Sequence, residues 1–199
     1  MRIQPFVSRL LSALFAGLLA LNFAAPVQAQ DASELTSNPG YVDLGQVQSW
    51  FNTPPNIEVN LKGTLLDLIA GSAEDGDSDF STLVSQLKAI QVRGYPMRNA
   101  SLEQIQQRLT DFSTQMEDSG WERVVYIRED DELVNIYVRP DGDSIAGLTV
   151  LATNPNDDES IFINIVGSIS PSQIGKIGRG LDIEELENVP TDSQSNQQN

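Results

Sequence analysis

Between Trp121 and Ser170 the chain alternates between β-favouring runs and short polar turns. The runs are rich in Val, Ile, Thr and Tyr, and the segments EDDE, PDGD and NPNDD separate them. Short runs of this composition, bounded by turn formers, are typical of consecutive antiparallel strands. The pattern therefore predicts a four-stranded antiparallel meander in this stretch.

The alternation also predicts a register, because a slip of one residue moves every side chain to the other face. Our register pairs Ile127 with Val134, Arg139 with Ile145, and Val150 with Ile163. One face of the predicted sheet is then apolar. It carries Val125, Ile127, Val134, Ile136, Val138, Ala146, Leu148, Val150, Ile161, Ile163 and Ile165.

The opposite face of the predicted sheet is polar. A row of four side chains crosses it, namely Tyr126, Asn135, Thr149 and Asn164. The row is flanked by Tyr137, by a Glu122–Arg139 pair and, from a neighbouring strand, by Arg93 and Tyr95. A solvated sheet face is the ordinary interpretation of such a row, and a binding surface is the alternative.

Hydrophobic spacing predicts the other elements. Strict alternation indicates strands at residues 56–63 and 90–95, whereas helical spacing indicates helices at 64–73, 80–87, 101–119 and 170–181. The helix at 101–119 has the clearest signals, with Ser101 as its predicted N-cap and Gly120 as its stop. Ser170 and Gln173 suit a capping box at the start of the last helix.

Each helix has one apolar stripe and the sheet has one apolar face, so the simplest arrangement places the helices on that face. We therefore predict an α+β fold, a two-layer sandwich whose mainly antiparallel sheet of about six strands has helices on one face. Residues 56–183 form the single predicted domain. An irregular lead-in at 30–55 docks its aromatic residues onto it, and residues 184–199 form a disordered acidic and polar tail.

The N-terminus has the three parts of a secretory signal peptide. Arg2 and Arg9 supply the basic region, Leu10 to Ala25 is an almost unbroken apolar run, and Val27–Ala29 fits a cleavage site. An uncleaved membrane anchor is the alternative interpretation, but the apolar run is shorter than the roughly twenty residues that a membrane span needs. We therefore expect cleavage after Ala29 and a mature chain that is secreted or periplasmic, without membrane insertion.

Composition excludes several functions. The chain has 199 residues, a formal net charge of −16, and neither Cys nor His. A strongly acidic protein is repelled by nucleic acid, because phosphate binding depends on basic side chains. Without Cys or His there is no thiol nucleophile, no Ser-His-Asp triad and no zinc or haem ligand of the usual kinds. No cofactor and no catalytic residue are predicted.

The loop at 74–79 is the nearest approach to a metal site. Asp75, Asp77 and Asp79 begin like the calcium loop of an EF-hand. The next positions that the motif needs, Gly at six and Glu at twelve, hold Phe80 and Gln86. An EF-hand is therefore excluded, and the choice left open is between a weak calcium loop and a solvated loop.

Several segments resemble one family in their order and spacing. They are NPGYVDLG, IEVNLKGTLLDLIA, LKAIQVRGY, WERVV, VNIYVRPDGDSIAGLTVLA and IFINIVGSISPSQIGKIGR. Over residues 39–183 the chain resembles the bacterial envelope proteins of domain-of-unknown-function family 4252. The resemblance implies a secreted or periplasmic bacterial protein. It implies no activity and no catalytic residue.

Our functional hypothesis is a soluble envelope binding or interaction module of unknown ligand that uses the polar open face of its sheet. Its partner would be an envelope protein or a small ligand. The candidate binding residues are Tyr126, Asn135, Tyr137, Arg139, Thr149 and Asn164. Two alternatives stay open: a structural or stress-protective envelope component, and a hydrolase based on carboxylates or tyrosine.

Overall fold

A computed structural model of the chain describes residues 29–71, 78–98, 100–129, 132–170 and 173. The described residues up to Ile169 belong to one compact unit, and Ser170 and Gln173 are described by themselves. Our predictions for the signal peptide, most of the acidic loop, the body of the last helix and the tail lie outside the described residues. Of the last helix, the capping contact is seen, since Gln173 Oε1 accepts from the Ser170 amide at 2.8 Å.

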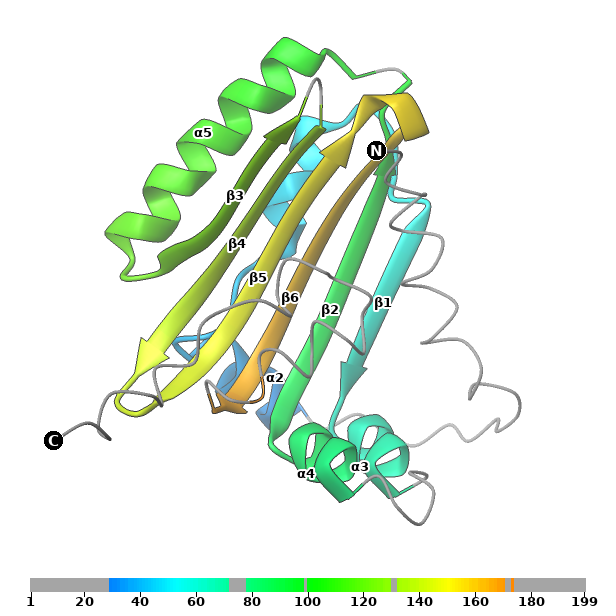
Figure 1. Ribbon diagram of the computed structural model, residues 1–199. Helices are drawn as coiled ribbons and strands as arrows, with labels where there is room; N and C mark the ends of the chain where they lie inside the picture. The colour runs from blue at the N-terminus through cyan, green and yellow to red at the C-terminus, as the bar shows by residue number, and fades with distance from the viewer. Residues whose placement is uncertain (1–28, 72–77, 99, 130–131, 171–172, 174–199) are drawn as a thin grey trace, which may run out of the picture. The chain divides into compact units, whose positions relative to one another are not determined.

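The elements follow the order that the hydrophobic pattern predicts (Figure 1). The strands are β1 (Ile57–Lys62), β2 (Leu87–Pro96), β3 (Glu122–Glu129), β4 (Glu132–Asp141), β5 (Ser144–Asn154) and β6 (Glu159–Ile169). The helices are α2 (Ala29–Thr36), α3 (Thr64–Gly71), α4 (Ser78–Ser85) and α5 (Leu102–Asp118), with 3-10 helices η1 (Leu44–Trp50) and η2 (Pro155–Asp157). The lead-in is thus more regular than predicted, since it contains α2 and η1. None of the described helices is long and apolar enough to span a membrane.

The six strands form one antiparallel sheet in the order β1-β2-β6-β5-β4-β3. The prediction of an α+β fold with a mainly antiparallel sheet is confirmed. The meander β3–β6 supplies four neighbouring strands, and β2 pairs with β6 to bring β1 to the far side. The two edges of the sheet are therefore β1 and β3.

Two of the three predicted registers are confirmed, because Ile127 pairs with Val134 and Val150 pairs with Ile163. The middle one is wrong by two residues: Val138 lies opposite Leu148 rather than Ala146. A β-bulge that leaves Ala146 as an extra residue of β5 accounts for one of the two residues, and the tight turn that pairs Asp141 with Ser144 accounts for the other. A two-residue shift preserves the faces, so the predicted apolar set stays together.

The position of the long helix differs from the prediction. α5 and η1 pack on the face that carries Asn135, Tyr137 and Asn164, not on the aliphatic face. Their shared core consists of Val42, Leu44, Val47, Phe51, Tyr95, Met97, Ile105, Leu109, Phe112, Met116, Trp121, Tyr137, Leu151 and Phe162. The physical reason is that Leu151 and Phe162 make the centre of this face apolar too, so β5 and β6 are buried on both sides.

Aromatic rings of the lead-in hold this layer together. Phe51 stacks on Tyr95 with ring centroids 4.4 Å apart, and Trp50 meets Phe112 and Phe162 edge-on, each at 5.6 Å. Offset and edge-on pairs of this kind add about 0.5–1.5 kcal/mol beyond burial. The predicted docking of the lead-in aromatic residues is therefore seen in the structure.

Candidate functional site

Four of the six predicted binding residues lie in the interior. Asn135 is 2% exposed, and Tyr137, Thr149 and Asn164 are each 0% exposed. The expectation of an open polar face is therefore wrong at these positions. Buried polar groups are tolerated where they are hydrogen-bonded, and here each has partners that the sequence pattern did not reveal.

Asn164 anchors the segment before η1 to the middle of the sheet. Its Nδ2 donates to Gly40 O at 3.0 Å and to Thr149 Oγ1 at 3.1 Å, while its Oδ1 accepts from Val42 N at 3.1 Å. Gly40 lies backbone to backbone against Gly147, where an added Cβ would clash with the chain. We call residues 38–44, which cross the sheet here, the strap.

Tyr137 and Arg139 also have structural roles. Tyr137 Oη donates to Ser113 Oγ at 2.5 Å beneath α5, and burial raises the pKa of this phenol. Arg139 donates to Gly120 O at the end of α5 instead of pairing with Glu122. Glu122 faces Val138, because a second bulge shifts β3 by one residue. Tyr137, Arg139 and Glu122, which were predicted to flank the polar row, thus do not form one binding surface.

Tyr126 is the predicted residue that stays exposed, and it lies in a groove of about 310 Å³ between α5 and the β3–β4 hairpin. The wall from α5 is mainly polar and consists of Gln106, Leu109, Thr110, Ser113, Thr114 and Glu117. The opposite wall consists of Arg123, Tyr126, Arg128, Glu132, Leu133 and Asn135. Of the predicted residues, the structure therefore brings Tyr126 and Asn135 together in this groove.

The bulge in β3 determines which side chains enter the groove. Regular alternation would place Arg123 with Val125 and Ile127 on the aliphatic face. The register shift between Arg123 and Val125 leaves Val124 as the extra residue and sets Arg123 opposite Tyr137. Arg123, Tyr126 and Arg128 therefore share one face. The bulge has turned the Arg123 side chain to this face, and bulges often redirect a side chain in this way beside functional sites.

Arg123 is positioned by three neighbours across the groove. Its guanidinium lies 5.2 Å from the centroid of the Tyr126 ring, 3.4 Å from Asn135 Oδ1 and 3.6 Å from a Glu117 carboxylate oxygen. The two polar contacts are long, and at these distances they contribute little energy. The guanidinium is thus oriented while several of its five donors stay available.

Arg128 has no hydrogen bond or ion pair with any described residue, and its side chain is exposed. The groove therefore presents two arginine forks on one strand, with an exposed aromatic ring between them. Glu117 and Glu132 balance the formal charge of the lining. In a protein of net charge −16, the lining of this groove is thus formally neutral.

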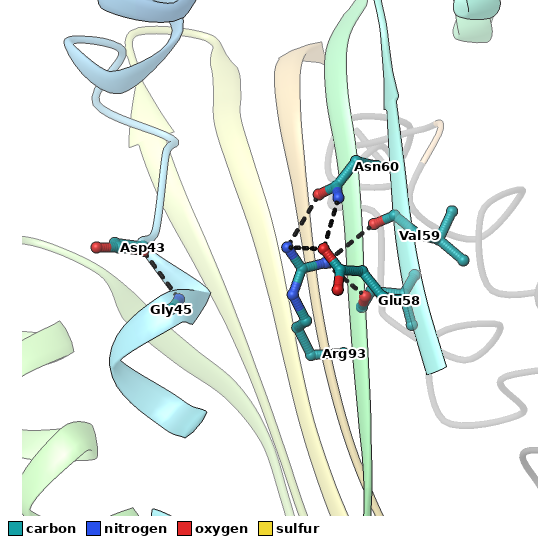
Figure 2. A network of polar contacts seen from close by, with 7 residues as sticks. Asp43, Gly45, Glu58, Val59, Asn60 and Arg93 are labelled. Carbon is teal, nitrogen blue, oxygen red and sulfur yellow. Dashed lines mark hydrogen bonds and ion pairs between the residues drawn. The ribbon is translucent and has the colours of Figure 1, made fainter. Parts of the chain in front are cut away.

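Arg93, on β2 next to the opposite edge strand, has all of its described contacts within the sheet (Figure 2). Its guanidinium donates to Val59 O, Val92 O and Asn60 Oδ1 and forms an ion pair with Glu58 at 3.2 Å. These contacts fasten β1 to β2. The predicted extension of the binding row through Arg93 is therefore a structural network, whereas the β3 groove keeps unused donors.

No metal centre is seen in the described part of the chain, where no three acidic side chains gather to hold an ion. Most of the loop at 74–79 lies outside that part. Its calcium hypothesis stays a prediction.

Comparison of the chain with models of known protein families tests the resemblance described above. A family model described as "Domain of unknown function (DUF4252)" matches residues 51–177. The chain belongs to the DUF4252 family. The match includes α5, β3 and β4, so the whole groove lies within the DUF4252 region, whereas the strap precedes it.

A search of solved structures with the DUF4252 chain finds similarity to the Ran-binding protein Mog1p of Saccharomyces cerevisiae, determined at 1.9 Å resolution. The identity is 14%, the TM-score is 0.31, and the alignment covers 75% of this chain and 82% of Mog1p. A search of curated proteins finds no match.

Besides the α5 wall, Glu132 and Leu133, the sequence pattern did not reveal Arg123 and Arg128 as groove residues of the DUF4252 chain. The available signal is the Val124–Val125 doublet, which interrupts the alternation of polar and apolar positions in β3. Such an interruption inside a strand is where a bulge is expected.

Proposed function

We propose that this protein is an exported, soluble binding module whose ligand site is the groove between α5 and the β3–β4 hairpin. The observation that carries the proposal is the bulge at Arg123–Val125, because it brings Arg123, Tyr126 and Arg128 onto one face. Exposed Tyr and Arg side chains are favoured at binding surfaces, since they offer contact area and hydrogen-bond donors.

The chemistry of the groove favours a ligand that carries a carboxylate. Arginine presents a planar fork of donors that matches a carboxylate in two hydrogen bonds. Arg128 is uncommitted and Arg123 is held by long contacts, so both can turn their donors to a ligand. The Thr, Ser and Gln side chains of α5 add neutral hydrogen-bonding groups on the facing wall.

Export is the second part of the proposal. The basic, apolar and cleavage regions of residues 1–29 support a periplasmic or secreted location. The absence of Cys and His makes the chain indifferent to the redox state and to most transition metals of that compartment.

The test is a titration of the purified chain with N-acetylglutamate, followed by backbone NMR shifts. We expect the amides of Arg123, Tyr126 and Arg128 to move together, and Arg128→Gln to weaken the binding roughly tenfold, the scale of one charged hydrogen bond. The matched control is Arg108→Gln, an exposed arginine of α5 outside the groove lining. Shifts centred elsewhere, or equal effects of the two variants, would overturn the proposal.

A further inference from the structure

β3 is an edge strand of the sheet (Figure 1), and three of its side chains line the groove. It pairs with β4 on one side, and no described strand pairs with it on the other. Six of its eight residues are exposed, and Val124 and Tyr126 are 43% and 53% exposed. The outer N–H and C=O groups of such an edge are a template for another strand.

We propose that an extended peptide segment of a partner protein adds to β3 as a seventh strand, with alternate side chains directed into the groove. The inference rests on the proposed function, because it names the class of ligand for the same site. In strand addition, backbone hydrogen bonds give affinity, and pockets for every second side chain give specificity. The edge strand β3 supplies the backbone groups for such hydrogen bonds, and the groove between β3 and α5 supplies the pocket for side chains.

The two faces of β3 define the chemistry of the partner segment. On the groove face an added strand meets Arg123, Tyr126 and Arg128, so it needs polar side chains that include a carboxylate. On the other face it continues the row of Val125 and Ile127, so it needs aliphatic side chains there. The partner is therefore an amphipathic extended segment with alternating polar and apolar residues.

The centre of β3 suits pairing better than its ends. Val125–Ile127 lie beyond the bulge, carry no charge and favour β structure, whereas Arg123, Arg128 and Glu129 flank this part of the strand. Charges at the ends of an edge strand restrict indiscriminate pairing, and they leave complementary partners able to bind.

A second copy of the chain is a weaker candidate for this edge. Each copy has a formal net charge of −16, so two copies repel each other before their edges meet. A neutral or basic peptide segment carries no such penalty. The charge balance therefore favours a different partner over self-association.

The opposite edge, β1, lacks the features of the β3 edge. Its side chains Glu58 and Asn60 are tied to Arg93 of β2 (Figure 2). Neither of the two grooves described for the chain is lined by a residue of β1. Among the described strands, β3 is thus the edge that combines an open backbone with a side-chain site.

The test uses a synthetic amphipathic peptide, acetyl-KVEVTVEVK-amide, with the purified chain. Fluorescence anisotropy measures binding, and hydrogen exchange follows the β3 amides. We expect the peptide to bind at least tenfold more tightly than a scrambled peptide of the same composition and to slow exchange in β3. Val124→Lys, a charge placed on the edge outside the groove lining, should reduce the affinity at least tenfold.

Two N-methylated peptides distinguish strand addition from simple side-chain binding. Methyl groups on alternate amides block the hydrogen bonds of one edge of the peptide only. Strand addition predicts that one isomer loses at least tenfold in affinity while its counterpart binds like the parent peptide. Equal binding of both isomers would overturn strand addition, even where the N-acetylglutamate titration succeeds.

Self-association is measured separately by light scattering over a range of concentrations. We expect a monomer whose mass does not change with concentration and which Val124→Lys does not alter. A concentration-dependent dimer that Val124→Lys abolishes would assign the edge to a second copy and overturn the inference.

Discussion

A single buried amide shows how polar residues of this sheet serve the fold. Asn164 joins two backbone groups of the strap to the centre of the sheet, at 3.0 Å from Gly40 O and 3.1 Å from Val42 N. The alternation of β6 gives its face but not its exposure, because the groups that satisfy it are more than 120 residues away. In the sequence it is therefore indistinguishable from a solvated asparagine.

The first prediction at this scale concerns Asn164→Leu. The substitution leaves Gly40 O and Val42 N buried without their partner, so we expect a loss of roughly 2–4 kcal/mol in the free energy of unfolding. Urea denaturation measures it. Gln91→Leu is the control, because its Nε2 lies 3.5 Å from Asn164 and contributes little, with an expected change below about 1 kcal/mol. A neutral Asn164→Leu variant would show that the strap does not depend on this amide.

At the scale of elements, local signals predicted much of the fold. Capping residues and apolar spacing gave all six strands and the long helix, and Ser101 does accept from Gln104 at the start of α5. The bulges at Val124 and beside Pro140 were not predicted. The Val124–Val125 doublet interrupts the alternation of β3, but the pairing with the neighbouring strand is needed to identify the extra residue. The face on which α5 packs was also not predicted. On that face Leu151 and Phe162 alternate with polar residues of the same strands, so the face as a whole was interpreted as polar.

The groove was predictable only in part for the same reason. Tyr126 and Asn135 were placed on one face by alternation, and the structure confirms that they lie opposite each other. Arg123 requires the bulge, and the facing wall requires the position of α5. Both the bulge and the position of α5 depend on contacts between segments that are distant in the sequence, so the periodicity of residues alone does not predict the groove.

The prediction at this scale compares two single-residue deletions in β3. Deleting Val124 removes the extra residue and keeps Arg123 and Tyr126 on the groove face, so stability should change by less than about 1 kcal/mol. Deleting Ile127 turns Tyr126 and Arg128 to opposite faces and removes the partner of Val134, so we expect a loss of about 2 kcal/mol or more. Thermal unfolding and the N-acetylglutamate titration measure both. Equal outcomes for the two deletions would contradict the assignment of Val124 as the bulged residue.

For the whole molecule, composition and charge bound what the protein can do. The chain has a net charge of −16 and neither Cys nor His, so a catalytic site with a thiol or an imidazole is excluded, and our proposal is recognition at a groove. The described helices and strands build a scaffold around that groove. Its chemistry comes from arginine, tyrosine and the hydrogen-bonding side chains of α5.

The prediction at this scale is export with removal of residues 1–29. The mass of the native protein, purified from its own cell envelope or medium, should correspond to a chain that begins at Gln30. A chain produced without an export system should keep the segment and serves as the size control. A native species that retains residues 1–29 and sediments with membranes would contradict this prediction.

The strap has a consequence for the order in which the chain folds. Its contacts with Asn164 span 122 and 124 residues, and β6 is the last of the described strands in the sequence. Closing so long a loop has an entropic cost, which is offset only when the contacts at both of its ends can form. We therefore expect the strap to dock only after the strands beneath it have assembled. A segment that precedes all the described strands in the sequence would then be among the last to reach its native position.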